Sequence, residues 1–223
     1  MHQRKSKIIL IYFFLFILFG SINNLSFSKI KFEKIKNINV NGLAKIDNQT
    51  IKKNIYSLNL ENIFFLNKNK IDNVIKSNTL VENYEIFKKY PSSLDIKIKK
   101  TDLLAMTNKN STVFLLGSNS KLTRNNNLNL ELPYIFGELD IDEFFKLKKK
   151  IDQSKISYSE IKNFYFYKSK RWDLELKNNT IIKLPKNYRK ESLDYVSKIL
   201  KDKSLKNLGM IDLRVEGQII LND

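Results

Sequence analysis

The side chains that most often carry out catalysis are scarce in this chain of 223 residues. There is no cysteine, and the single histidine, His2, lies in a short basic N-terminal tail. Nucleophile and base pairs of the Cys-His or Ser-His type therefore cannot be built in a domain that folds after this tail. The glycines are scattered and form no phosphate-binding loop.

A metal site would have to be made of carboxylates, and Asp140, Asp142 and Glu143 form the densest such group. Acidic residues directly before an apolar helical pattern are more often a helix N-terminus, which the helix dipole stabilises. We therefore predict that Asp140 caps a helix. We assign no catalytic, cofactor-binding or metal-binding residue, and we expect the protein to be no enzyme and to need no cofactor.

The remaining chemistry is that of the main chain at the edge of a sheet. The segment Arg214 to Leu221 has the pattern of a last, extended strand. A strand at the rim of a sheet presents unpaired N–H and C=O groups, to which a partner can add a strand of its own. The alternative is a closing strand that pairs only within its own sheet.

An apolar segment precedes the folded part. Arg4, Lys5 and Lys7 are followed by the charge-free run 8–22, which reaches the roughly 20 residues of a membrane span when extended to residue 27. We predict a cytoplasmic tail over residues 1–7 and a transmembrane signal anchor over residues 8–27, with the bulk of the chain outside the cytoplasm. A cleaved secretory signal is the alternative.

The formal net charge of +17 raises the question of a nucleic-acid partner. The lysines are spread along the chain among Asn and Ile, and no aromatic-basic stacking motif accompanies them. We therefore predict a solvated basic surface and no nucleic-acid binding. A mild attraction to anionic lipid headgroups is compatible with this charge.

The first folded region has the order β-α-α-β-β. A strand closes at Gly42, two short helices follow, and strands over residues 81–90 and 93–100 are joined by a turn at Pro91. This order predicts a three-stranded sheet backed by two helices. We expect Phe64 and Phe65, between the helices, to belong to the core.

The second region is rich in strands, so the fold class is α+β. Trp172, Leu174 and Leu176 alternate with acidic residues before a turn at Asn178-Asn179, which predicts a hairpin with Trp172 in the core. A strand is expected over residues 112–116, a loop over residues 118–129 and a helix over residues 189–205.

Five short motifs follow the apolar segment in a fixed order. They cover residues 38–42 (INVNG), 90–98 (YPSSLDIKI), 132–137 (LPYIFG), 171–176 (RWDLEL) and 211–214 (IDLR). In this order the chain resembles the bacterial cell-division family FtsQ, called DivIB in other lineages. Tyr90 stands where the family usually has Trp, and Val215 stands where many members have Tyr.

The resemblance implies a POTRA domain over residues 35–104 and an FtsQ-type β domain over residues 105–223. It implies a non-catalytic, single-pass (type II) scaffold of the divisome in the inner membrane at the division septum. Such a scaffold would help to link early and late division proteins and to control septal peptidoglycan synthesis. Its partners would be FtsB and FtsL, with FtsB pairing with the last strand, and other divisome proteins that dock on the POTRA sheet.

The residues that the resemblance assigns to partner binding are Arg171, Arg214, Val215, Glu216, Gly217, Gln218, Ile219 and Ile220. Arg214 matches a family arginine that pairs with an acidic partner residue, and Arg171 is a second candidate. Two other classes of function stay open at this point. One is an anchored POTRA-type chaperone or transport module that binds extended peptides, and the other is an anchored hydrolase.

Overall fold

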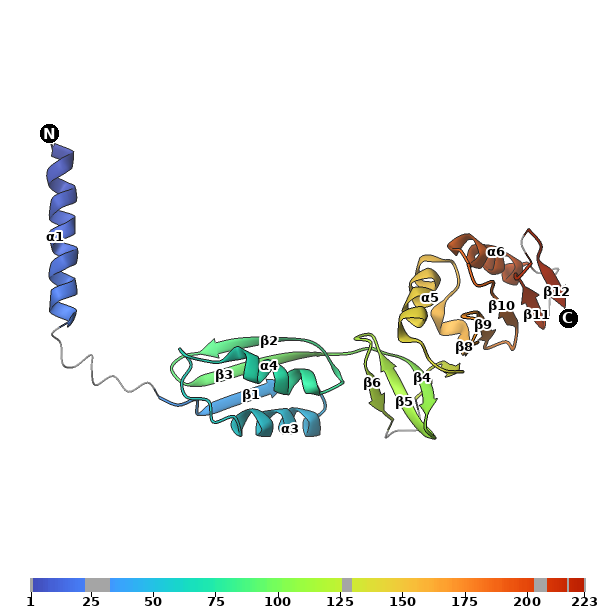
Figure 1. Cartoon of the computed structure of the whole chain (residues 1–223), viewed down its shortest axis with the longest axis horizontal. Helices are drawn as coiled ribbons and strands as arrows, with labels where there is room; N and C mark the ends of the chain where they lie inside the picture. The colour runs from blue at the N-terminus through green and yellow to red at the C-terminus, as the bar shows by residue number, and fades with distance from the viewer. Residues whose placement is uncertain (1, 23–32, 126–129, 203–207, 216, 223) are drawn as a thin grey trace.

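The computed structural model describes residues 2–22, 33–125, 130–202, 208–215 and 217–222. A helix, α1 (His2–Ile22), is followed by two β-sheets, each with its own hydrophobic core (Figure 1). This combination of helices and sheets confirms the α+β fold class.

The helix α1 carries the apolar run of the N-terminus, and the side chains of residues 7–20 are exposed. In the part of the chain that the structure describes, no helix combines the length and the apolar character needed to cross a membrane. The predicted span of residues 8–27 continues past Ile22 into residues 23–27, which lie outside the described ranges.

The first sheet has the predicted order of elements. These are β1 (Asn37–Asn41), α3 (Lys45–Tyr56), α4 (Lys68–Ser77), β2 (Val81–Lys89) and β3 (Ser93–Lys100). The strand order is β1-β3-β2, with β1 parallel and β2 antiparallel to β3. Ile51, Ile55, Ile71 and Ile75 of the two helices are buried with Ile96 of the central strand. The helices thus bury one apolar stripe each on one face of the sheet.

The expectation that Phe64 and Phe65 are core residues is wrong. Their exposed fractions are 52% and 73%, whereas the preceding Ile63 is fully buried. The side-chain oxygen of Asn62 accepts hydrogen bonds from the backbone N–H groups of Phe64 and Phe65, at 3.0 Å each. This local turn reverses the chain directly after Ile63, so only Ile63 of the three apolar residues faces the core.

The second sheet has nine strands, in the order β12-β11-β10-β9-β8-β7-β4-β5-β6. Its elements are β4 (Leu103–Lys109), β5 (Thr112–Gly117), β6 (Leu122–Arg124), β7 (Tyr134–Phe136), α5 (Ile141–Gln153), a 3-10 turn η1 (Tyr158–Glu160), β8 (Ile161–Phe166), β9 (Trp172–Leu176), β10 (Ile181–Lys183), α6 (Lys190–Lys201), β11 (Met210–Asp212) and β12 (Ile220–Asn222). The crossovers through α5 and α6 make β7 parallel to β8 and β10 parallel to β11.

The core of this sheet centres on Trp172, which is fully buried, as predicted. Its ring lies 6.3 Å from that of Phe144 on α5 and 4.4 Å from that of Phe166 on β8, measured between ring centroids. The Asp140 carboxylate accepts a hydrogen bond from the Glu143 N–H at 3.2 Å, which confirms that Asp140 caps α5. The cluster of acidic residues around Asp140 is therefore explained by the helix start.

Two predicted boundaries are corrected. The expected loop of residues 118–129 contains β6, because its short apolar-polar stretch pairs with β5 at the end of the sheet; residues 126–129 lie outside the described ranges. The helix expected over residues 189–205 is described as α6, Lys190–Lys201, with Arg189 at its N-cap, and residues 203–207 also lie outside the described ranges.

Candidate partner-binding edge

The last strand, β12, lies at one end of the nine-stranded order and pairs with β11 alone among the strands that the structure describes (Figure 1). Met210 is paired with Asn222, Ile211 with Leu221 and Asp212 with Ile220. The last described strand thus lies at the rim of the sheet, as expected, although it covers only residues 220–222 of the region where a strand over residues 214–221 was predicted. The side chains of Ile220 and Leu221 are exposed there.

The hydrogen bonds of β11 show which backbone groups of β12 point outward. Ile181 N donates to Gly209 O at 2.9 Å, and Leu213 N donates to Lys183 O at 3.0 Å. The Gly209 C=O and the Leu213 N–H thus face β10, whereas the Gly209 N–H donates to Asn222 O at 2.9 Å. By the alternation along a strand, Ile211 directs its backbone groups to β10, and residues 210 and 212 direct theirs to β12. Their partners Asn222 and Ile220 face back toward β11, and Leu221 between them directs its N–H and C=O away from the sheet.

The predicted contact segment is not one continuous strand. Of the assigned residues only Ile220 lies in β12, and Glu216 lies outside the described residues. Gly217 has a φ of +73°, and Gln218 N donates to Val215 O at 3.2 Å, so the chain turns between β11 and β12. The turn is required because β12 must reverse direction to pair antiparallel with β11. Val215 and Ile219 are exposed on either side of this turn.

Arg214 stands at the base of the turn and binds Asp212. Its Nε donates to Asp212 Oδ1 at 2.8 Å and to Oδ2 at 2.9 Å, and its backbone N–H donates to Oδ1 at 3.0 Å. These bonds hold the pKa of the buried Asp212 carboxyl below its usual range and raise the pKa of Arg214. The Arg214 side chain is 40% exposed, so part of it faces solvent while Asp212 fixes its position.

Arg171, the second candidate arginine, lies beside another buried acid. Its Nε is 3.4 Å from Asp173 Oδ1, and its guanidinium carbon lies 4.5 Å from the centre of the Tyr167 ring. The distance and geometry do not make a hydrogen bond between Nε and Oδ1. The contact is an ion pair between Arg171, directly before β9, and Asp173 on β9, the strand that is second from β11.

The structure brings the two arginines to one face of the sheet. Lys183 of β10 pairs in register with Asp173 of β9 and with Asp212 of β11. The row Asp173-Lys183-Asp212 therefore crosses three strands on one face, with Arg171 bound to one acid and Arg214 to the other. Sequence reasoning named the arginines but missed the two aspartates. The alternation of Asp173 with Trp172 and Leu174 was a signal that it shares a face with other polar residues.

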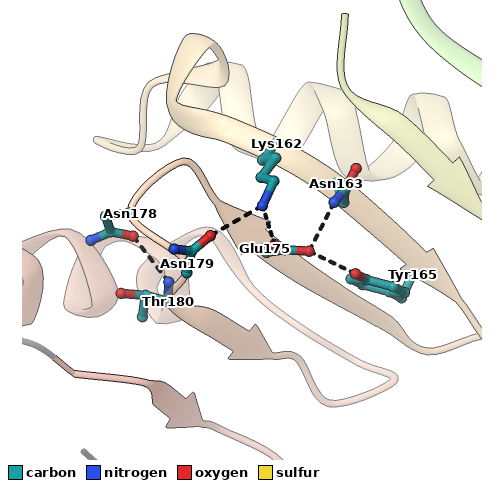
Figure 2. Close-up of polar contacts among 7 residues, drawn as sticks. All are labelled: Lys162, Asn163, Tyr165, Glu175, Asn178, Asn179 and Thr180. Atoms are coloured by element: carbon teal, nitrogen blue, oxygen red, sulfur yellow. Dashed lines mark hydrogen bonds and ion pairs between the residues drawn. The ribbon is translucent and has the colours of Figure 1, made fainter.

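A polar network continues on the same face toward β8. Figure 2 shows the Glu175 carboxylate between Lys162 Nζ at 2.9 Å, Asn163 Nδ2 at 2.8 Å and the Tyr165 hydroxyl at 2.6 Å. Lys162 also donates to Asn179 Oδ1 in the β9–β10 turn, at 3.1 Å. Hydrogen bonds from Asn163, Tyr165 and Lys162 lower the pKa of Glu175 to about 2, and the bond to Glu175 raises the pKa of Tyr165 to about 12.

Family comparisons agree with this architecture. A model of the FtsQ-type POTRA domain matches residues 33–100. A model of the cell division protein FtsQ/DivIB C-terminal region matches residues 96–214, which is more than half of the chain. The chain belongs to the FtsQ/DivIB family. Its family membership places it among the cell-division proteins and identifies the first sheet as the POTRA fold. The turn and β12 follow directly after the residues matched by the FtsQ/DivIB model.

The chain is also similar to individual proteins. The chain is 26% identical to the cell division protein FtsQ of Rickettsia bellii over 184 residues, covering 81% of this chain and 69% of the relative. It is 31% identical to the cell division protein DivIB of Clostridium acetobutylicum over 94 residues, covering 42% of this chain and 38% of the relative. The major extracytoplasmic domain of DivIB from Geobacillus stearothermophilus is 10% identical, with a TM-score of 0.33, covering 48% of this chain and 92% of that one.

Proposed function

We propose that this FtsQ/DivIB-type chain is a non-catalytic scaffold of the divisome that binds FtsB, itself paired with FtsL, by adding a strand of FtsB to β12. The observation that carries the proposal is the outward direction of the Leu221 N–H and C=O at the free edge of the sheet. A strand that pairs with this edge can form main-chain hydrogen bonds with these two groups.

The side chains around the edge supply the specificity of this proposed site. Val215, before the turn, and the consecutive residues Ile219, Ile220 and Leu221, after it, are large apolar residues that are exposed. Arg214, held by Asp212, and Arg171, beside Asp173, offer fixed positive groups on the same face of the sheet. A partner strand with apolar residues and an acidic side chain matches this arrangement.

The scaffold is proposed to sit in the inner membrane at the division septum. Residues 8–27 would anchor it, with residues 1–7 in the cytoplasm and the POTRA domain (35–104) and β domain (105–223) outside. The charge-free run and the basic residues before it support this orientation. From there the chain would help to link early and late division proteins and to control septal peptidoglycan synthesis.

The test measures binding of the extracytoplasmic segment of FtsB from the same organism to the full chain in lipid nanodiscs, by calorimetry. Leu221→Pro removes the outward N–H but no hydrogen bond to β11, so the edge strand should stay folded. Leu221→Ala shortens the same side chain and keeps the N–H. Strand addition predicts saturable binding that Leu221→Pro abolishes and Leu221→Ala largely keeps.

Three other results have distinct meanings. Equal affinity of the wild type and Leu221→Pro would contradict strand addition at β12 and direct attention to the POTRA sheet. Loss of binding in Leu221→Ala as well would make the side chain, and not the main chain, the recognised group. Binding of many unrelated extended peptides with similar affinity would support the chaperone alternative over the divisome scaffold.

A further inference from the structure

One end of the POTRA domain carries a group of exposed aromatic residues, which we name the aromatic end. It consists of Phe64 and Phe65, in the loop before α4, and Tyr90, in the turn between β2 and β3. Their exposed fractions are 52%, 73% and 63%. The rings of Phe64 and Tyr90 lie 5.2 Å apart between centroids, so two separate loops form one apolar surface. Contiguous exposed apolar patches are candidates for interaction surfaces, whereas singly exposed apolar residues are not.

The aromatic end is where the chain arrives from its N-terminal segment. Lys34 forms a β-bridge with Asn62, Ile35 N donates to Glu61 O at 3.2 Å, and Lys36 N donates to Ser92 O at 2.9 Å. The first residues of the domain are thus bound directly to both aromatic loops. An attachment of the segment before residue 33, such as a membrane anchor, therefore also restricts the position of this end of the domain.

The length of the connection limits how far this end can be from a bilayer. If the proposed anchor ends at residue 27, residues 28–32 separate it from the start of the domain. Five extended residues span at most about 18 Å. The headgroup region of one leaflet is roughly 5–8 Å thick. The aromatic end therefore stays within reach of the headgroups. The Tyr90 ring is favoured there because it joins an apolar body to a polar hydroxyl, and the two Phe rings can be buried at the boundary with the acyl chains.

The charges near the aromatic end fit a negatively charged surface. Among the described residues of these loops, Lys34, Lys36, Lys88 and Lys89 stand against Glu33, Glu61 and Asp95, a formal surplus of one positive charge. Lys36 binds Glu33 at 2.9 Å and Lys89 binds Asp95 at 3.0 Å. Lys34 and Lys88 lie outside these two pairs and face one further acid, Glu61, which leaves the surplus of one positive charge. Anionic headgroups attract lysines that lie close to the bilayer surface.

We propose that the aromatic end of the POTRA domain rests on the surface of an anionic phospholipid bilayer, with Phe65 in the headgroup region. The contact would fix the orientation of the domain on the membrane, and with it the direction in which the β domain projects. The proposal rests on the membrane anchor proposed above, and it adds a second, peripheral membrane contact to it.

The absence of cysteine from the chain allows one position to be labelled at a time. The full chain is reconstituted in vesicles of phosphatidylcholine with or without phosphatidylglycerol, as Phe65→Cys carrying an environment-sensitive fluorophore. The matched control is Ile46→Cys, an apolar residue with an exposed fraction of 78%. Ile46 lies in the first turn of α3, and the Tyr56 hydroxyl at the other end of this helix binds Ile38 N and Lys36 O. Ile46 is therefore about 15 Å from Tyr56 along the helix, away from the end at which residues 34–36 enter the domain.

The proposal predicts a blue-shifted emission at position 65 that lipid-attached quenchers reduce. The effect should be strongest with phosphatidylglycerol and weaken at high salt, while the label at position 46 stays in water. Resistance of the protein to extraction with alkaline carbonate tests the membrane anchor independently of the fluorophore. Protein that resists extraction with a water-exposed label at position 65 overturns this contact and leaves the anchor intact. Release of the protein by carbonate would overturn both the anchor and the contact. Equal emission shifts at positions 65 and 46 would also overturn the specific contact.

Discussion

Arg214 and Asp212 form a two-residue clasp at the base of the turn that leads into β12. The guanidinium and the backbone N–H of Arg214 both bind the Asp212 carboxylate, which is almost fully buried. The arginine that the family resemblance assigns to a partner is therefore already engaged within its own chain. A partner acid would meet a guanidinium whose position is fixed beforehand.

Removal of Arg214 should destabilise the β domain as well as weaken partner binding. Arg214→Ala leaves the Asp212 carboxylate buried without its charged partner, which should lower the free energy of unfolding by about 1–3 kcal/mol. Urea unfolding followed by the fluorescence of Trp172 measures the change. The double variant Arg214→Ala with Asp212→Asn removes the uncompensated charge and should recover part of the loss. A double variant no more stable than Arg214→Ala would contradict the clasp.

The network around Glu175 predicts a loss of stability in acid. The folded pKa of Glu175, about 2, is below its ordinary value of 4.5, so its contribution is complete above pH 4.5 and is lost as the pH falls toward 2. The difference in free energy of unfolding between the wild type and Glu175→Gln should therefore shrink over this range. Subtraction of the variant removes the contributions of Asp95 and Asp212, whose pKa values are also lowered. A constant difference down to about pH 3 would show that the network does not stabilise the carboxylate.

Two glycines with positive φ should respond differently to substitution. Gly42 has a φ of +118°, and a Cβ there would lie 1.7 Å from Ile98 O, whereas Gly217 has a φ of +73° and open space around it. Gly42→Ala should destabilise the POTRA domain by about 2–4 kcal/mol, because backbone strain and a clash with β3 add together. Gly217→Ala should lower stability by only about 1 kcal/mol. Chemical unfolding of both variants checks the order, and equal losses would contradict it.

The POTRA domain and the β domain are joined by side-chain hydrogen bonds from the β5–β6 turn. The Asn119 amide donates to Thr79 O and to Val81 O at 2.9 Å each, and Ser118 Oγ donates to Glu82 Oε2 at 2.8 Å. Asn119→Ala removes the two hydrogen bonds that the side-chain amide donates. The variant should loosen the joint, because the chain segment Thr101-Asp102 that links the two sheets is only one of the contacts between the domains.

Spin labels at Ile46→Cys and Tyr195→Cys, both exposed, report the distance between the domains. Asn119→Ala should broaden the distance distribution, while Asn108→Ala, at an exposed position on β4, should leave it unchanged. Stability should fall by about 1–2 kcal/mol in the first variant. A distribution as narrow as that of the wild type would show that other contacts hold the joint.

Much of the local structure was predictable from the residues because it is encoded by neighbours in sequence. The cap at Asp140, the hairpin with Trp172 in the core and the β-α-α-β-β order each follow from spacing of a few residues. Local patterns also led to the error at Phe64 and Phe65. Their apolar character suggested burial, but the Asn62 turn decided which side of the chain faced the core.

The sequence by itself determined the fold class, most of the elements and, through its motifs, the family. Only the tertiary structure decided where the edge strand β12 begins and that the backbone groups of Leu221 face outward from it. It also decided that Arg171 and Arg214 share one face through Asp173, Lys183 and Asp212. The spacing of apolar residues in the sequence indicates which side of a helix or strand is apolar. Strand neighbours, in contrast, are chosen by packing between residues far apart in the chain, and no local pattern records that choice.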